Sequence, residues 1–434
     1  MKEIISIHLG DLGLNLAQTL WPRFQQETLD FDQTSITDSP FYSEYQSGSV
    51  KPRAILCDLD AQNMDYIRMQ EGCIFDRDCM INHKDGSGGI TVRGKYTTGK
   101  EIRDQVLECI RKQTEQCDSV DGFMLYFSPL GGTSGVSDYI LQEIHDQKSK
   151  CMGVFNVPNQ NTSSLVVQMF NFVLCQHQMR EMLGSNIVFS NQNIQNNLSS
   201  QLKVKHPHLK EVNHALTDMI SNLTCGMRFQ HSTTNSLSLR ELINTQCLYR
   251  QANFSQIVHY LPSQDEAASV GLRDTLYTKN HHFLNYKVDS THEFIQEKIF
   301  AHTLLTRGGS LHQSDISSVL KESSKYKQHL GDNLFLYNHT SRPSQSSLLQ
   351  FQPRAKFTAL QNSSDFMHVL EKIEYEFDML YRYRAFVFWF VGEGMESGEF
   401  SECRENISVM KQDYQELYNM GNANNEEEDD DEEQ

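Results

Sequence analysis

Residues 123–135 read FMLYFSPLGGTSG, a short apolar run followed by a turn that contains three glycines. The apolar run is typical of a buried β-strand, and a helical pattern begins directly after the turn. Glycines between a strand and a helix let the backbone approach a phosphate group, and the helix N-terminus favours its negative charge. The turn is not a P-loop, because it lacks the Gly-Lys-Ser/Thr ending. By composition alone, it fits a phosphate cradle and a plain flexible turn equally well.

Strand and helix patterns alternate on both sides of this turn. Residues 3–9 (EIISIHL) predict a strand, and Leu12, Leu16 and Leu20 then lie on one face of a helix. Further strands are predicted at 54–59, 152–157 and 187–189, and further helices at 102–110 and 163–182. This alternation predicts an α/β fold with a parallel sheet that helices cover on both faces. Ligands of such sheets bind beyond the carboxyl ends of the strands, where the glycine-rich turn lies.

The second half of the chain has a different pattern. A wide apolar stripe at 212–223 predicts a helix that is buried between two domains. The stretch from 254 to 360 has an α+β pattern, and two helical stretches follow it. Its predicted elements are a polar loop at 263–282, strands at 299–305 and 355–360, and helices at 314–321, 365–384 and 400–418.

A helix start is predicted upstream, at Thr98. Thr98 and Glu101 have the spacing of a capping box, in which the threonine caps the helix and the glutamate follows three residues later.

The charge of the chain is strongly negative and unevenly spread. The chain has 434 residues and a formal net charge of −18, and eight consecutive acids occupy 426–433. Nucleic acids and anionic membranes attract positive surfaces, so we expect neither as a partner. The N-terminus lacks the apolar region of a signal peptide, and no stretch approaches ~18 uninterrupted apolar residues. The ten cysteines include no C-x-x-C pair, which favours reduced thiols in a cytosolic protein.

Five segments of the chain resemble tubulin. They are EIISIHLGDLG at 3–13, RGKYTTGKEI at 93–102, LGGTSG at 130–135, NLTCGMRF at 222–229 and RAFVFWFVGEGMESGEFSECRENISVMKQDYQEL at 384–417. The last segment, which precedes the acidic run, is more similar to the α branch of the family than to the β branch. The resemblance runs nearly end to end and is poor between about 254 and 349.

The resemblance implies a tubulin-like, three-layer nucleotide-binding domain with a parallel sheet, an α+β intermediate domain and C-terminal helices. The implied boundaries are 1–228 for the GTP-binding domain with its central helix, 229–363 for the intermediate domain, 364–420 for the helical region and 421–434 for a disordered acidic tail.

It also implies GTP and magnesium as ligands. The matching nucleotide-binding positions are Asp11, Ser128, Gly131, Gly132, Thr133, Ser164, Asn191 and Asn213. The two asparagines match positions that read the guanine, and an amide side chain offers a donor and an acceptor together. Asp60 matches the acid near the magnesium. Glu241 matches the catalytic glutamate of α-type subunits, which acts in trans on the nucleotide of a neighbouring β subunit.

Several positions depart from the family pattern. Asp11 replaces a glutamine, and a carboxylate repels phosphates unless a cation lies between them. Leu130 and Val136 replace glycines at the two ends of the glycine-rich loop, where a side chain restricts the backbone. The other replacements are Gly89 for an asparagine near the phosphates, Gln168 for the ribose-binding glutamate and Leu209 for the tyrosine that stacks on guanine.

These observations predict a divergent, GTP-binding, α-tubulin-like constituent of cytoplasmic microtubules that pairs with β-tubulin. A cilium is one specialised structure in which such a subunit would serve. The acidic run is typical of a solvated segment, and in this family it would dock basic microtubule-associated proteins or motors. The alternative is a nucleotide-free, tubulin-fold regulator or capping protein. A free-standing GTPase is poorly supported, because no complete catalytic set lies in one chain.

Overall fold

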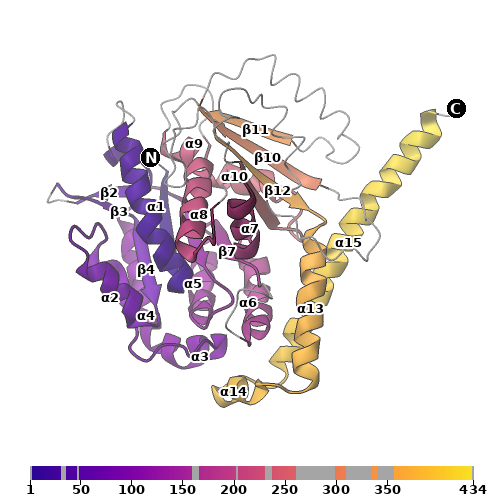
Figure 1. Ribbon diagram of the computed structural model, residues 1–434, viewed down its shortest axis with the longest axis horizontal. Helices are drawn as coiled ribbons and strands as arrows, with labels where there is room; N and C mark the ends of the chain where they lie inside the picture. The colour runs from indigo at the N-terminus through magenta and orange to yellow at the C-terminus, as the bar shows by residue number, and fades with distance from the viewer. Residues whose placement is uncertain are drawn as a thin grey trace.

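One mixed sheet of ten strands runs through the computed structural model of the chain (Figure 1). The structure describes residues 2–30, 36–45, 48–158, 166–201, 204–229, 237–260, 299–308, 334–339 and 356–432. Within these ranges, the strand order across the sheet is β11-β10-β12-β9-β8-β7-β6-β1-β4-β5.

The strands from β9 to β5 in this order are parallel, as the alternating sequence pattern predicts. They are β1 (Glu3–Leu9), β4 (Ala54–Asp58), β5 (Met80–Asn82), β6 (Val120–Phe127), β7 (Cys151–Asn156), β8 (Ser185–Phe189) and β9 (Phe254–Tyr260). Every residue of β1 is buried, which explains why its sequence is a continuous apolar run and not an alternating one.

The strands of the α+β region extend this same sheet. β12 (Lys356–Ser363) pairs antiparallel with both β9 and β10 (Ile299–Arg307), and β11 (Leu334–His339) forms the edge beside β10. The strand predictions at 299–305 and 355–360 are confirmed. The loop predicted at 263–282 and the helix predicted at 314–321 lie outside the described residues.

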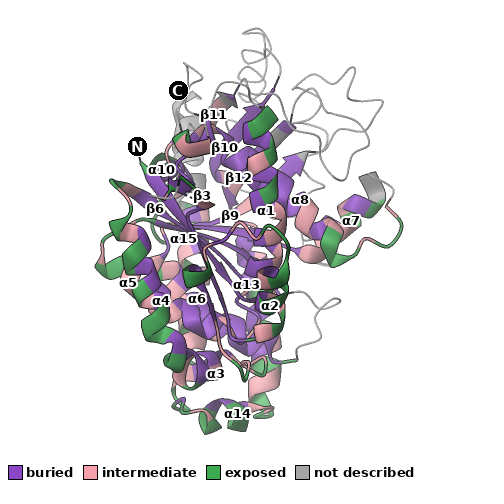
Figure 2. Cartoon of the chain, turned by 90° about the vertical axis from the view of Figure 1, so that its left-hand side faces the viewer, coloured by how far each residue is buried: buried purple, intermediate pink, exposed green. Residues whose placement is uncertain are grey.

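Helices cover both faces of the sheet, and each face has its own hydrophobic cluster. Along β6, Phe123 and Leu125 belong to one cluster and Met124 and Tyr126 to the other, which is the two-residue period of a strand. The first cluster packs against α4 (Thr98–Glu115), α5 (Ser134–Asp146), α6 (Gln168–Met182), α13 (Phe366–Arg382) and α15 (Glu399–Glu432). The second packs against α1 (Gly10–Asp30), α2 (Ala61–Met69), α7 (Asn191–Gln201), α8 (Leu209–Leu223) and α10 (Leu239–Gln246). Figure 2 shows this three-layer arrangement, with the strands buried and the outer helix faces exposed.

Shorter elements connect these layers. They are β2 (Tyr42–Glu44) and β3 (Val50–Pro52), which form a small separate sheet, the 3₁₀ turns η1 (Ile36–Asp38) and η2 (Arg77–Cys79), and the helices α3 (Thr91–Tyr96), α9 (Cys225–Arg228) and α14 (Val387–Gly392). α8 packs against α1 on one side and against β10 and β12 on the other. It therefore covers the face of the sheet where the antiparallel strands join the parallel part at β9.

Two predictions about helix ends are wrong. Thr98 does not cap α4: the cap position is Thr97, and the Thr98 hydroxyl donates to the carbonyl of Arg93, because α3 runs almost directly into α4. α15 continues through the acidic run to Glu432, where the sequence predicts a disordered tail. No proline interrupts this stretch, but its glycine, asparagines and aspartates are weak helix formers and its adjacent carboxylates repel one another, so the local sequence does not explain the helix.

The ten cysteines are free, as predicted, and six of them are buried. In the described part of the chain, none of the helices is both long enough and apolar enough to cross a bilayer.

Candidate functional site

A cleft of about 730 Å³ lies beyond the carboxyl ends of β1, β4, β6 and β7. Its wall comes from the loops that follow these strands and from the first residues of α1, α6, α7 and α8. This is the position that the topology favours for a ligand, and the volume is that of an ordinary small-molecule site.

Two glycine turns form the floor of the cleft. Gly10 has a φ of +66°, which suits glycine, and a Cβ at this position would meet the side chain of Thr133. Gly132 approaches the loop before α3 so closely that a Cβ would lie 2.3 Å from the hydroxyl oxygen of Ser87. The glycine-rich turn is therefore shaped by tight packing and is not a plain flexible turn.

One buried amide holds these loops together. Asn171 of α6 donates from Nδ2 to the carbonyl oxygens of Gly89 at 2.7 Å and Leu130 at 2.8 Å, and its Oδ1 accepts from the Thr91 N–H at 3.1 Å. Asn171 could not be singled out from the sequence, because it lies inside a helix far from both loops in the chain.

Four carboxylates line the cleft. Asp85 follows β5, and the other three, Asp11, Asp58 and Asp60, stand on the side formed by β1 and β4. Burial, with the nearby Asp11, raises the pKa of Asp58 to about 6, although hydrogen bonds from the Asp60 and Leu59 N–H groups and the Thr133 hydroxyl oppose the shift. Desolvation also raises the pKa of Asp11, with Asp60 contributing and a hydrogen bond from Asn63 opposing. Asp60 caps α2 by accepting from the Gln62 N–H at 3.1 Å.

The opposite wall is rich in amides. It contains Asn156 at the end of β7, Gln168 at the start of α6, Asn191 at the start of α7 and Asn213 in α8. The Oδ1 atoms of Asn156 and Asn191 are buried without a hydrogen-bond partner among the described residues, as is Oδ2 of Asp58. Buried oxygens of this kind are costly unless a ligand, ion or water satisfies them, so these positions fit a polar ligand.

The sequence of the chain is similar to those of known proteins. The model of the Tubulin/FtsZ family, GTPase domain, matches residues 3–199, which include both glycine turns. The chain is 29% identical to the tubulin alpha-8 chain of Caenorhabditis elegans, with 96% of both chains covered. It is also 29% identical to the tubulin alpha-1B chain of Physarum polycephalum and to the tubulin alpha-3 chain of Saccharomyces cerevisiae, with 96% of this chain and 97% and 98% of theirs covered. The chain belongs to the tubulin superfamily. Within it, the chain is α-tubulin-like.

The structure brings most of the predicted site residues together. The cleft is lined by Asp11, Asp60, Ser128, Gly131, Gly132, Thr133, Asn191 and Asn213. Ser164 lies outside the described residues. Asp58 and Asn156 also line the cleft and were missed, although Asp58 lies near the end of the strand predicted at 54–59, two residues before Asp60, and that position was a usable signal.

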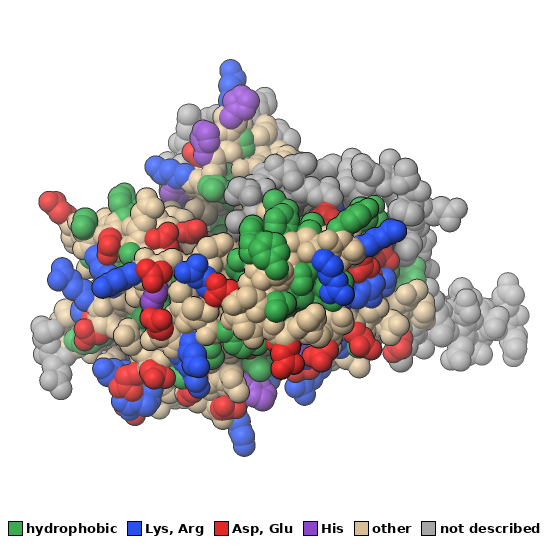
Figure 3. Space-filling view, turned by 90° about the horizontal axis from the view of Figure 1, so that it is seen from below, with side chains coloured by type: hydrophobic (Ala, Val, Ile, Leu, Met, Phe, Trp, Pro, Cys, Tyr) green, Lys and Arg blue, Asp and Glu red, His purple; other side chains and the backbone are tan. Residues whose placement is uncertain are grey.

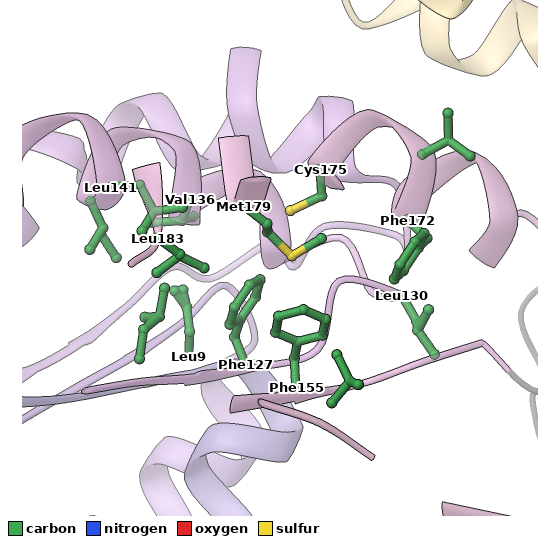
Figure 4. Close-up of a cluster of buried hydrophobic side chains, with 14 of the residues drawn as sticks. Leu9, Phe127, Leu130, Val136, Leu141, Phe155, Phe172, Cys175, Met179 and Leu183 are labelled. Carbon is green, nitrogen blue, oxygen red and sulfur yellow. The ribbon is translucent and has the colours of Figure 1, made fainter. Parts of the chain in front are cut away.

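Two departures from the tubulin pattern, Leu130 and Val136, contribute to the hydrophobic core. Leu130 and Val136 are buried in the hydrophobic cluster beneath α5 and α6, where Figure 4 shows them among Leu141, Phe172 and Met179. Neither has a positive φ. Both side chains are buried and neither backbone position requires glycine, although Leu130 also lines the cleft. That they restrict the phosphate loop stays a prediction.

Leu209 and Gly89 are two further departures from the tubulin pattern, and both line the cleft. Leu209 is 62% exposed on the wall, so it provides apolar area but no ring at the position of the family's tyrosine. Gly89 has a φ of +75°, so glycine suits this turn better than the family's asparagine.

Glu241 does not belong to the cleft. It lies in the first turn of α10, near β10 and β11, at the opposite end of the molecule from α3 (Figure 1). Its carboxylate accepts a hydrogen bond from the hydroxyl of Tyr337 at 3.2 Å. The chain thus carries its predicted catalytic acid at the end remote from its own cleft.

An exposed apolar patch lies near the cleft end of the molecule. It consists of Tyr383 and of Phe388, Trp389 and Val391 in α14, and Phe388 is 67% exposed. The Thr97 hydroxyl donates to Glu393 just after α14 at 2.6 Å, which ties this region to the junction of α3 and α4. Figure 3 views the molecule from this end and shows hydrophobic side chains gathered among charged ones.

Proposed function

We propose that this tubulin-superfamily chain is a divergent, α-type microtubule subunit that binds a guanine nucleotide and pairs with β-tubulin. The observation that carries the proposal is the cleft, which combines glycine turns, carboxylates on one wall and amides on the other. A nucleoside triphosphate also has two chemically different ends. Its phosphates match the glycine turns, with a cation between them and the carboxylates, and its polar base matches the amides.

The phosphates fit the glycine side of the cleft. The turn between β6 and α5 brings backbone N–H groups and the Ser128 and Thr133 hydroxyls to the N-terminus of a helix, which favours an anion. The base fits the side of Asn191 and Asn213, whose amides can pair with the donors and acceptors of a guanine edge.

Magnesium fits the carboxylate side. This ion is usually held by one or two carboxylates together with substrate phosphates, and Asp58 and Asp60 offer that donor set at the end of β4. When bound, the ion would offset the repulsion between these acids and the phosphates. Asp11 adds a third carboxylate, so this chain should depend on the cation more strongly than a subunit with a glutamine there.

A second subunit fits the patch formed by Tyr383, Phe388, Trp389 and Val391. Soluble monomers rarely expose grouped aromatic side chains without a partner. Because the patch and the cleft lie toward the same end, a subunit that covers the patch would come close to the cleft. The α-tubulins that this chain resembles support β-tubulin as that subunit.

Two features of the cleft favour the rival function of a nucleotide-free regulator. Three carboxylates on one wall and a leucine in place of a stacking ring both weaken the affinity for a polyphosphate.

The nucleotide content of the purified chain separates the two functions. Protein purified in magnesium should release close to one guanine nucleotide per chain on denaturation, as measured by chromatography. A folded protein that releases no guanine nucleotide and takes none up with magnesium present would establish the regulator in place of the subunit.

A further inference from the structure

The end of the molecule remote from the cleft holds a carboxylate that a residue from another element positions. Glu241 is the third residue of α10, and Tyr337 belongs to the edge strand β11, 96 positions further along the chain. The tyrosine hydroxyl donates to Oε1 of Glu241 at 3.2 Å.

The local sequence would favour a different hydrogen-bond partner for the Glu241 carboxylate. Ser238 caps α10 by accepting from the Glu241 N–H at 3.1 Å, and a glutamate at this position commonly reaches back to the N–H of its cap. The structure shows the first of these bonds, whereas the Glu241 carboxylate extends to Tyr337. A side chain that leaves its local partner for a distant one is typical of a functional position.

The surroundings of Tyr337 fix its hydroxyl at this point. The hydroxyl also contacts the side chain of Thr245, one helical turn after Glu241 on the same face of α10. Partial burial and the Glu241 carboxylate raise the pKa of Tyr337 to about 12, so the phenol stays protonated and remains a donor at neutral pH.

We propose that Tyr337 is a positioning residue for Glu241, and this inference rests on the proposed subunit function and on the catalytic role in trans that the resemblance to tubulin implies for Glu241. The hydroxyl occupies Oε1 and sets the direction of the carboxylate, while Oε2 has no hydrogen-bond partner within the described residues. That second oxygen accepts a proton from the water that attacks the γ-phosphate of the nucleotide on the adjoining subunit. The O–P bond to water forms, the bond to the β-phosphate breaks, and GDP and phosphate leave.

The test is a set of copolymers with β-tubulin in which the content of this chain is measured and phosphate release is followed. Glu241→Ala should nearly abolish release at the interfaces that this chain provides. Tyr337→Phe should slow release about tenfold, because the carboxylate loses its orientation but keeps its charge. Incorporation into polymer and melting temperature should not change, since phenylalanine retains the ring.

Tyr249→Phe is the matched control. Tyr249 lies just after α10, is 46% exposed, and its hydroxyl makes no hydrogen bond in the described part of the chain. This variant should release phosphate at the wild-type rate. In a double-mutant cycle, adding Tyr337→Phe to Glu241→Ala should have no further effect, because the hydroxyl would then have nothing to orient.

The outcomes distinguish the positioning role of Tyr337 from the proposed function of the chain. If Glu241→Ala slows release and Tyr337→Phe does not, the positioning role is overturned and the proposed function stands. If Tyr337→Phe lowers incorporation or melting temperature in proportion to the rate, the tyrosine is merely structural. If polymers exclude the chain, the proposed function fails. If Glu241→Ala has no effect in polymers that contain the chain, the catalytic role of Glu241 fails and the positioning role fails with it, while the proposed subunit function stands.

Discussion

The Thr133 hydroxyl donates a hydrogen bond to Oδ1 of Asp58 at 3.0 Å and so joins the glycine-rich turn to the end of β4. The two residues are 75 positions apart, yet this bond connects the wall that fits phosphates to the wall that fits magnesium. Asp58 is only 2% exposed and its Oδ2 has no partner among the described residues. The buried acid therefore costs stability in the free protein.

The first prediction concerns pH. The folded-state pKa of Asp58 is raised from 3.8 to about 6, so the folded protein holds a proton that the unfolded chain has lost. Stability should therefore fall as pH rises from about 4 to about 6 and then level off, and ionised Asp58 should cost about 2–3 kcal/mol at neutral pH. Asp58→Asn should remove this loss.

The measurement is the melting temperature of nucleotide-stripped protein between pH 4.5 and 7.5. The difference between Asp58→Asn and wild type should grow in favour of the variant as pH rises, whereas magnesium-dependent nucleotide binding by the variant should weaken. A difference that is constant with pH would show that Asp58 is not the group responsible.

The second prediction concerns guanine selectivity. Asn191→Ala or Asn213→Ala should each weaken nucleotide binding by about 1–3 kcal/mol, because a buried ring edge would lose its partner. Competition between guanine and adenine nucleotides measures the selectivity. Asn196→Ala is the control, since Asn196 is exposed on α7 and does not line the cleft. Equal effects on both nucleotides would place the asparagines away from the base.

The third prediction concerns Val136. This side chain is fully buried against the core, near Gly99 of α4. Val136→Gly restores the family's residue but opens a cavity and weakens α5, so the free energy of unfolding should drop by about 2–4 kcal/mol. Thermal melting measures this loss. Nucleotide affinity should not improve, and a tighter-binding variant would mean that Val136 does restrict the phosphate loop.

The fourth prediction concerns the apolar patch. Trp389→Glu places a charge among exposed aromatic residues and should weaken association with β-tubulin at least tenfold, while the melting temperature of the isolated chain changes little. Met69→Glu provides the control, because Met69 is 82% exposed on α2, away from α14. Sedimentation of each variant with β-tubulin measures association. Equal binding by Trp389→Glu and wild type would remove the patch from the interface.

Sequence patterns predicted the elements that bury continuous apolar runs, but not the contacts between loops. The runs at 3–9 and 123–127 could only be satisfied inside a sheet, so β1 and β6 follow from their sequences. Asn171 could not be predicted in its role, because a polar residue in a helix looks the same whether it binds water or joins two loops. The helix cap at Thr98 failed for a related reason: the spacing fits a capping box, but α3 already occupies the space before it.

The residues that line the cleft were predicted more completely than the contacts that hold side chains in place. The resemblance to tubulin located Asn191 and Asn213, which are separated by α7 in the chain but lie on one wall of the cleft. It could not show that Leu130 and Val136 face the core, since the direction of a side chain depends on packing against α6. Nor could it pair Glu241 with Tyr337, because that contact joins a helix to a strand far along the chain.

The last prediction concerns the acidic end of α15. The helix packs through Phe400, Ile407, Met410 and Tyr414, all fully buried, and Leu417 is the last buried side chain in the part of α15 whose side chains the structure describes. Residues 424–434 contain no apolar side chain, and eight adjacent carboxylates repel one another along a helix. Deleting 426–434 should therefore leave the melting temperature and incorporation into polymer nearly unchanged. The same deletion should weaken the binding of basic microtubule-associated proteins, and this binding should fall steeply with salt, since exposed charges are screened over ~8 Å at physiological ionic strength. Cosedimentation at several salt concentrations measures both effects. A clear drop in melting temperature on truncation would show that the acidic segment packs on the body, and its role as a docking surface would have to be given up.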